Sequence, residues 1–123
     1  MKKIRIDEKD VDLLATPYSL VLYTREFGDD KDLVNDSMTL VQGFQNGKIN
    51  GILLLQVIWC FAKTAKMMEN VKIFPAFDDW MMGLQSVDVG NQDNMILVTE
   101  LINERLFREE KKEEPESEQQ SGE

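Results

Sequence analysis

The feature that most constrains this chain is an apolar run from Ile52 to Ala62, which only Gln56 interrupts. The apolar pattern continues at helical length to about Glu69, which favours one long helix over a buried strand. Such a helix would be apolar around most of its circumference, and helices of that kind lie at the centre of a bundle or at a protein interface. The run is far shorter than the ~20 residues that a membrane span requires, so we do not expect a membrane protein.

The length and the cysteine content indicate one soluble domain in a reducing compartment. At 123 residues the chain can bury a core without disulfides. Cys60 has no second cysteine to pair with, and we expect it to be a small core residue. The residues that follow Lys2 and Lys3 alternate between apolar and charged, so we expect no signal peptide.

The net charge of −9 is concentrated toward the C-terminus. Residues 109–123 contain seven Glu and two Lys, a charge of −5, which leaves −4 for residues 1–108. A segment rich in Glu, Gln, Ser, Pro and Gly without apolar residues is typical of a disordered tail. Nucleic-acid binding normally requires a cluster of Lys and Arg, and none is found in the sequence, so nucleic acid is not expected as a partner.

Helix caps and apolar periodicity predict five helices. Thr16 is placed to cap the first helix, and Gly28 is placed to end it. Asp30 or Asp32 would cap the second helix, and Asn50 would cap the third. The five expected ranges are about 17–27, 32–42, 52–69, 75–84 and 92–108.

We therefore expect an all-α fold. It would be a compact bundle of about five helices within residues 1–108, followed by a disordered acidic tail over residues 109–123. Residues 2–6 alternate, with Ile4 and Ile6 on one side, and predict a short extended N-terminal arm.

The residues that most enzymes and metal sites use are missing or wrongly spaced. The chain has no His, which removes the usual general base and metal ligand. A carboxylate cluster that starts at Asp30 has Asn35 and Val41 where a calcium loop needs Gly and Glu. The glycines between residues 43 and 51 lack the spacing of a phosphate-binding loop. We therefore expect no enzyme, no cofactor and no metal site.

Two groups of apolar side chains are candidates for partner binding. One group lies on the apolar helix, where the alternative is a role in the core. The other contains a tryptophan and two adjacent methionine pairs. Adjacent residues point in different directions around a helix, so one Met of each pair is expected in the core and the other at the surface, where flexible thioethers suit varied apolar partners. The alternative is that all of these methionines fill gaps in the core. The candidates are Leu54, Ile58, Phe61, Met67, Met68, Trp80, Met81 and Met82.

Four motifs follow one another along residues 13–108. They are Leu13-Leu14-Ala15-Thr16-Pro17 with Tyr23, Glu26-Phe27-Gly28 and Asp32-Leu33-Val34-x-Asp36; Trp59-x-x-Ala62-Lys63-Thr64-Ala65; Pro75-x-Phe77-Asp78-Asp79-Trp80; and Glu100-Leu101-Ile102-x-Glu104-x-x-Phe107-Arg108. Each motif consists of cap and core residues, but their order and spacing together resemble the tail assembly chaperones of long-tailed phages and prophages of Gram-positive bacteria.

This resemblance implies an all-helical, non-enzymatic protein of the host bacterial cytoplasm that is absent from the mature virion. It implies binding to the phage tape-measure protein, which such a chaperone keeps soluble until tail-tube subunits polymerise around it. A protein that coats a long helix repeats along it, so we expect a homo-oligomer with head-to-tail contacts. Many members of the family also have a frameshifted, extended form that recruits the tail-tube protein. The resemblance places a frameshift region at Lys111 and Lys112; the alternative is that these two residues only interrupt a solvated run of Glu.

The sequence is also compatible with a different class of function. A small acidic helical protein can act as a regulator or inhibitor that binds a basic protein surface. Such a protein needs its negative charge ordered on the folded face, whereas more than half of the net charge here lies in residues 109–123.

Overall fold

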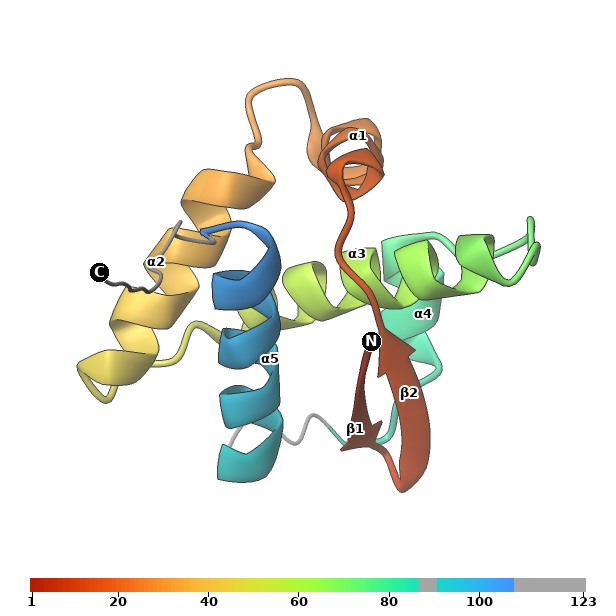
Figure 1. Ribbon diagram of the computed structural model, residues 1–123. Helices are drawn as coiled ribbons and strands as arrows, with labels where there is room; N and C mark the ends of the chain where they lie inside the picture. Colours follow the sequence, from red (N-terminus) through yellow and green to blue (C-terminus); the bar gives the residue numbers. More distant parts are fainter. Residues whose placement is uncertain (87–90, 108–123) are drawn as a thin grey trace, which may run out of the picture.

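The computed structural model describes residues 1–86 and 91–107. Within these residues the chain forms two strands and five helices (Figure 1). In chain order they are β1 (Lys2–Ile6), β2 (Lys9–Leu13), α1 (Pro17–Phe27), α2 (Leu33–Gln45), α3 (Gly51–Met68), α4 (Phe77–Met82) and α5 (Gln92–Arg105). The tail predicted over residues 109–123 lies outside the described residues.

The prediction of an all-α fold was wrong, because the N-terminal segment forms a β-hairpin. β1 and β2 pair antiparallel, with Ile4 opposite Val11 and Ile6 opposite Lys9. Asp7 and Glu8 make the turn with φ values of 57° and 64°, the left-handed pair that a two-residue hairpin turn requires. The expected arm is thus one strand of a pair. The second strand also alternates, with Val11 and Leu13 more buried than Asp10.

Helix α3 lies at the centre of the domain, as its apolar circumference predicted (Figure 1). Trp59 and Phe61 are fully buried, and α1, α2, α4 and β2 all pack against this helix. Of the described helices, α3 alone has the length and hydropathy of a membrane span, a test that the core helices of soluble proteins also pass. Inside this domain 61% of its length is buried.

The predicted caps of the first three helices are confirmed. Thr16 Oγ1 accepts a hydrogen bond from the main chain of Tyr18, and Gly28 ends α1 with a φ of 117°. Asp32 and Asn50 cap α2 and α3 through their side-chain oxygens. In each of these helices, the side chain of the N-cap residue therefore accepts a hydrogen bond from one main-chain N–H that has no partner within the helix.

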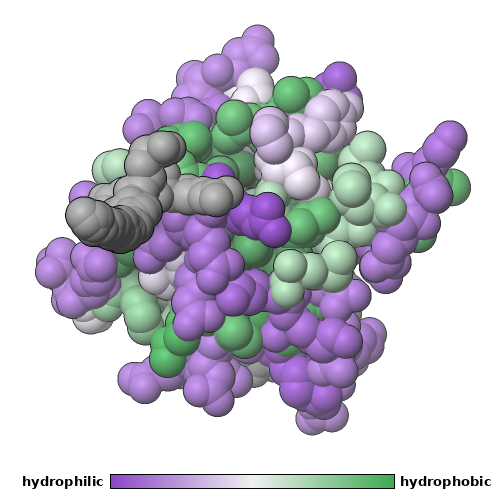
Figure 2. Space-filling view, in the orientation of Figure 1, coloured by the Kyte–Doolittle hydropathy of each residue, from purple (hydrophilic) through white to green (hydrophobic). Residues whose placement is uncertain are grey.

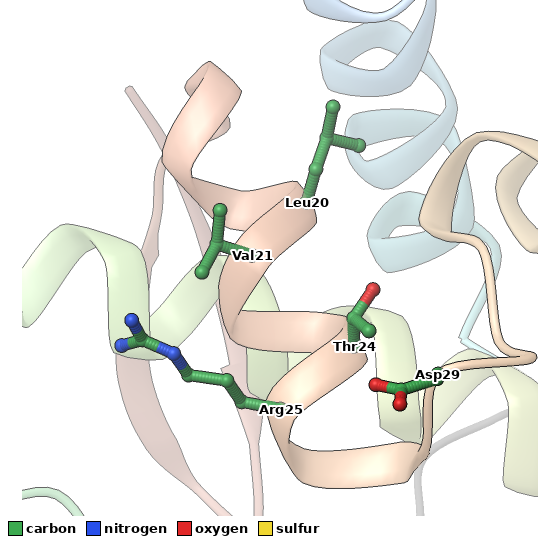
Figure 3. Close-up of a pocket in the computed structure, with 5 residues that line it drawn as sticks. All are labelled: Leu20, Val21, Thr24, Arg25 and Asp29. Atoms are coloured by element: carbon green, nitrogen blue, oxygen red, sulfur yellow. The ribbon is translucent and has the colours of Figure 1, made fainter.

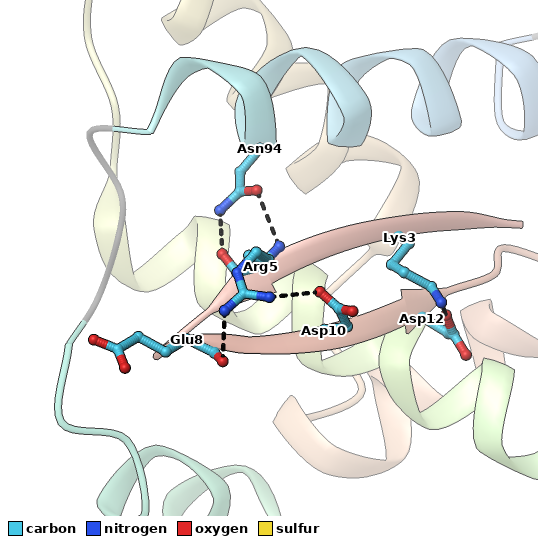
Figure 4. Close-up of polar contacts among 6 residues, drawn as sticks. All are labelled: Lys3, Arg5, Glu8, Asp10, Asp12 and Asn94. Carbon is cyan, nitrogen blue, oxygen red and sulfur yellow. Dashed lines mark hydrogen bonds and ion pairs between the residues drawn. The ribbon is translucent and has the colours of Figure 1, made fainter.

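The hairpin is fastened to α5 by one asparagine and one lysine. Asn94 accepts a hydrogen bond from the Arg5 N–H at 3.2 Å and donates one to the Arg5 carbonyl at 2.6 Å (Figure 4). Lys2 Nζ lies 3.3 Å from Glu100 and 3.4 Å from Glu104, and the hydrogen bond to Glu100 is the main cause of a raised Lys2 pKa. These contacts hold the outer edge of β1 against the helix.

Candidate partner-binding surface

A cluster of aromatic rings holds the short helix α4 against the rest of the domain. The Phe27 and Phe77 ring centroids lie 5.1 Å apart, edge to face, and Phe77 stacks on Trp80 at 6.2 Å. Trp59 Nε1 donates a hydrogen bond to the Pro75 carbonyl at 2.9 Å, just before α4 begins. A helix of six residues has little stability of its own, so these contacts determine where Trp80 lies.

Helix α1 supplies the missing cap of α4. Ala76 at the N-cap has no side chain that can cap the helix, and Glu26 of α1 accepts a hydrogen bond from the Phe77 N–H at 2.7 Å. A carboxylate at a helix N-terminus also interacts favourably with the helix dipole. The sequence motif that contains Glu26 and the motif that contains Phe77 therefore meet in space.

A second polar contact joins α1 to α2. Tyr23 OH donates a hydrogen bond to Asp36 Oδ2 at 2.6 Å, and Lys31 Nζ lies 3.1 Å from the same oxygen. Burial, with a further contribution from Asp36, raises the pKa of Tyr23 well above its ordinary value of 10.0. Tyr23 and Asp36 both belong to the first motif, so this motif also performs a packing role.

Three of the candidate partner-binding residues lie in the core. Leu54 and Ile58 are 2% exposed and Phe61 is 0% exposed. Their side chains belong to the hydrophobic cluster around α3. In this fold, these three residues present almost no surface to a partner.

The methionines and Trp80 are more accessible. Met67, Met68 and Met82 are 38%, 65% and 85% exposed. Met81 and Trp80 are half-buried and pack against the core. The expected division of each pair into one buried and one exposed member thus applies to Met81 and Met82, whereas Met67 and Met68 are both exposed.

Two further apolar residues extend the exposed end of α3. Val71 is 39% exposed and Ile73 is 90% exposed, in the segment that follows the helix. Asn70 reverses the chain there with a φ of 65°, and the Val71 N–H bonds back to the Lys66 carbonyl at 3.0 Å. We name Met67, Met68, Val71 and Ile73 the α3 tip, which projects at one side of the molecule in Figure 1. These apolar residues can be read from the sequence, but their exposure depends on the chain reversal at Asn70.

Helix α1 carries an open hollow on its outer face (Figure 3). Leu20, Val21, Thr24, Arg25 and Asp29 line a volume of about 380 Å³. Arg25 donates a hydrogen bond to the exposed Tyr18 hydroxyl at 2.8 Å. Figure 2 shows apolar residues at the surface over this helix.

A second hollow of about 210 Å³ lies between β2, α3 and α4. Its apolar walls are Val11, Ala62, Phe74 and Trp80. Asp10, Asp12 and Lys66 complete its lining. Of the candidate residues, only Trp80 lines this hollow, and the aromatic cluster described above places it there.

The thiol of Cys60 is buried. The Cys60 thiol donates a hydrogen bond to the Ser19 carbonyl at 3.1 Å, and burial raises its pKa to about 12. Among residues 1–86 and 91–107, no three His, Cys, Asp or Glu side chains lie close enough together to hold a metal ion. The α3 tip is apolar, whereas the two hollows combine apolar walls with charged residues.

Comparisons of this chain with protein-family models, with curated proteins and with solved structures found no match.

Proposed function

We propose that this protein is a phage tail assembly chaperone that binds the tape-measure protein and keeps it soluble while the tail tube polymerises. The observation behind this proposal is the ordered set of four motifs between residues 13 and 108. The protein would act without catalysis, in the cytoplasm of the host bacterium, and would be absent from the mature virion.

The contacts among the motif residues support this reading of the motifs as one unit. Glu26 with Phe77 and Trp59 with Pro75 each join two different motifs, and Tyr23 with Asp36 joins two segments of the first motif. Residues of the motifs thus build the scaffold, and the partner would be bound by exposed side chains of that scaffold. The α3 tip and the two hollows are the surfaces suited to this role.

An extended product would bring the tail-tube protein to the same complex. The residues Glu110-Lys111-Lys112-Glu113 can be encoded by a run of adenines, on which a ribosome can slip. A slip there would follow α5, which ends at Arg105, and both products would keep the described domain.

Co-expression with the tape-measure protein tests the proposal. The tape-measure protein of the same phage or prophage is produced alone, with this protein, and with an unrelated acidic helical protein of similar size as the control. We expect soluble tape-measure protein, co-purifying with this chain, only in the second case. Equal solubility in all three cases, with no co-purification, would contradict the proposed function.

A further inference from the structure

The hairpin has one edge that is covered and one that is not. Arg5 directs its N–H and its carbonyl away from β2, since both bond to Asn94 of α5 (Figure 4). Opposed residues in an antiparallel pair either exchange both main-chain bonds or neither. Arg5 and Asp10 are therefore opposed without main-chain hydrogen bonds between them. Lys3 and Asp12, two residues further from the turn, are opposed in the same way. Asp10 and Asp12 direct their main-chain groups to the outer edge of β2.

These main-chain groups have no protein partner in the part of the chain that the structure describes. β2 packs on α3, but a main-chain hydrogen bond joins them only where the strand has ended, at 3.1 Å from the Leu14 N–H to the Phe61 carbonyl. Before that point, no described residue bonds to the N–H or carbonyl of Asp10 or Asp12. An edge of this kind is a template for an additional strand.

The hollow beside this edge has walls suited to an apolar side chain. Phe74 and Trp80 line it opposite β2, and the half-buried Val11 lines it from the inner face of the strand. Its volume of about 210 Å³ exceeds that of one large aliphatic side chain. A strand paired with β2 would direct every second side chain toward this face.

The same edge is acidic. Asp10 and Asp12 alternate with Val11 along the strand and also line the hollow; Arg5 of β1 contacts Asp10 at 3.1 Å and Lys3 contacts Asp12 at 3.7 Å. β1 thus already presents alternating basic and apolar residues to β2, with Ile4 buried between its two cations. A strand on the outer edge of β2 meets the same two carboxylates and the same apolar face.

We propose that the outer edge of β2 binds an extended segment of a partner protein in which basic and apolar residues alternate. The segment pairs with the main chain of Asp10 and Asp12, places an apolar side chain between Phe74 and Trp80, and places its cations beside the two carboxylates. The identity of the partner rests on the proposed function, so the segment is an extended stretch of the tape-measure protein, outside the helix that the chaperone would coat. A second copy of β2 is disfavoured, because Asp10 and Asp12 would face the same carboxylates of the other copy.

Two probes, one control peptide and three variants test this site. The probes are the tape-measure protein and a short synthetic peptide of alternating Lys and Val. The control peptide has the same sequence and is N-methylated on the amides of every other residue. Asp10→Pro removes an outward N–H from β2, and Trp80→Ala removes a wall of the hollow. Ile96→Ala, at an exposed position of α5 that does not line the hollow, is the control. Circular dichroism verifies that each variant is folded.

We expect Asp10→Pro, Trp80→Ala and N-methylation each to weaken binding about tenfold or more, with Ile96→Ala binding as the wild type does. Equal binding of the methylated and unmethylated peptides overturns the proposal, and this comparison needs no variant to fold. If the wild type and all edge variants bind the tape-measure protein equally, the edge site is wrong and the chaperone function stands. If only the peptide binds, at the edge, the chaperone function is wrong and the edge site stands.

Discussion

Single residues inside the domain are joined by a chain of hydrogen bonds. Thr16 donates its N–H to Ser19 Oγ at 3.1 Å, Ser19 Oγ and Thr64 Oγ1 lie 2.7 Å apart, and Thr64 donates to the Cys60 carbonyl at 2.9 Å. The chain connects the start of α1 to the middle of α3. Cys60 is therefore a packing residue, and its thiol is held in the neutral form by burial.

The raised pKa of Cys60 predicts a loss of stability in alkaline solution. Burial raises this pKa from 9.0 to about 12, so the unfolded thiol loses its proton before the folded one does. The contribution of the Cys60 thiol to the free energy of unfolding is complete below pH 9.0. It falls between pH 9.0 and about 12, by up to ~1.4 kcal/mol per pH unit. Denaturant unfolding across this range should show a steeper decline for the wild type than for Cys60→Ala. Parallel declines in the two proteins would contradict the prediction.

At the scale of elements, the hairpin and α4 depend on side chains from elsewhere in the chain. Two strands alone, or a helix of six residues, are marginal in water. Asn94 of α5 holds β1, whereas Glu26 of α1 and Trp59 of α3 hold α4. The position of both short elements is thus a property of the assembled domain.

Asn94 provides the sharpest test at this scale. In Asn94→Ala, the Arg5 N–H and carbonyl lose their partners in a part-buried position, and we expect a loss of ~1–3 kcal/mol in the free energy of unfolding. The amide of Arg5 should also exchange its hydrogen faster. Asn103→Ala, at an exposed position of the same helix, is the control and should leave both measurements unchanged. An unchanged Arg5 exchange rate in Asn94→Ala would show that β1 is held by other contacts.

The molecule as a whole is a small, mostly helical domain that exposes several large apolar side chains. Its centre is occupied by α3, and the end of the same helix carries the exposed α3 tip. Apolar residues that project from a domain favour contact with another chain. The expected homo-oligomer and the proposed tape-measure complex both require surfaces of this kind.

We predict that the protein forms oligomers whose mass increases with concentration, through contacts that include the α3 tip. Met68→Asp and Ile73→Asp place charge on this surface and should shift the distribution to smaller species without loss of helical content. Ile96→Asp, at a position of α5 that is 47% exposed, is the matched control. Multi-angle light scattering over a range of concentrations measures the masses. One constant monomer mass for the wild type would contradict this prediction.

The sequence by itself determined the helices and the central position of α3. Thr16, Gly28, Asp32 and Asn50 act on the turn of chain beside them, so their effect is readable without tertiary structure. The apolar residues around most of the circumference of α3 likewise required burial on most sides. Local hydrogen bonding and periodicity are sufficient for these conclusions.

Only the tertiary structure decided the rest. β2 became a strand because Val11 and Leu13 pack inward while β1 pairs along one edge and places Lys3 and Arg5 beside Asp12 and Asp10, a choice that depends on residues beyond the segment itself. Leu54 and Met68 lie on one apolar helix, yet one is buried and the other is 65% exposed, because neighbouring elements cover the middle of α3 and leave its end free. Burial and edge exposure are set by contacts between segments distant in sequence, and no local pattern encodes them.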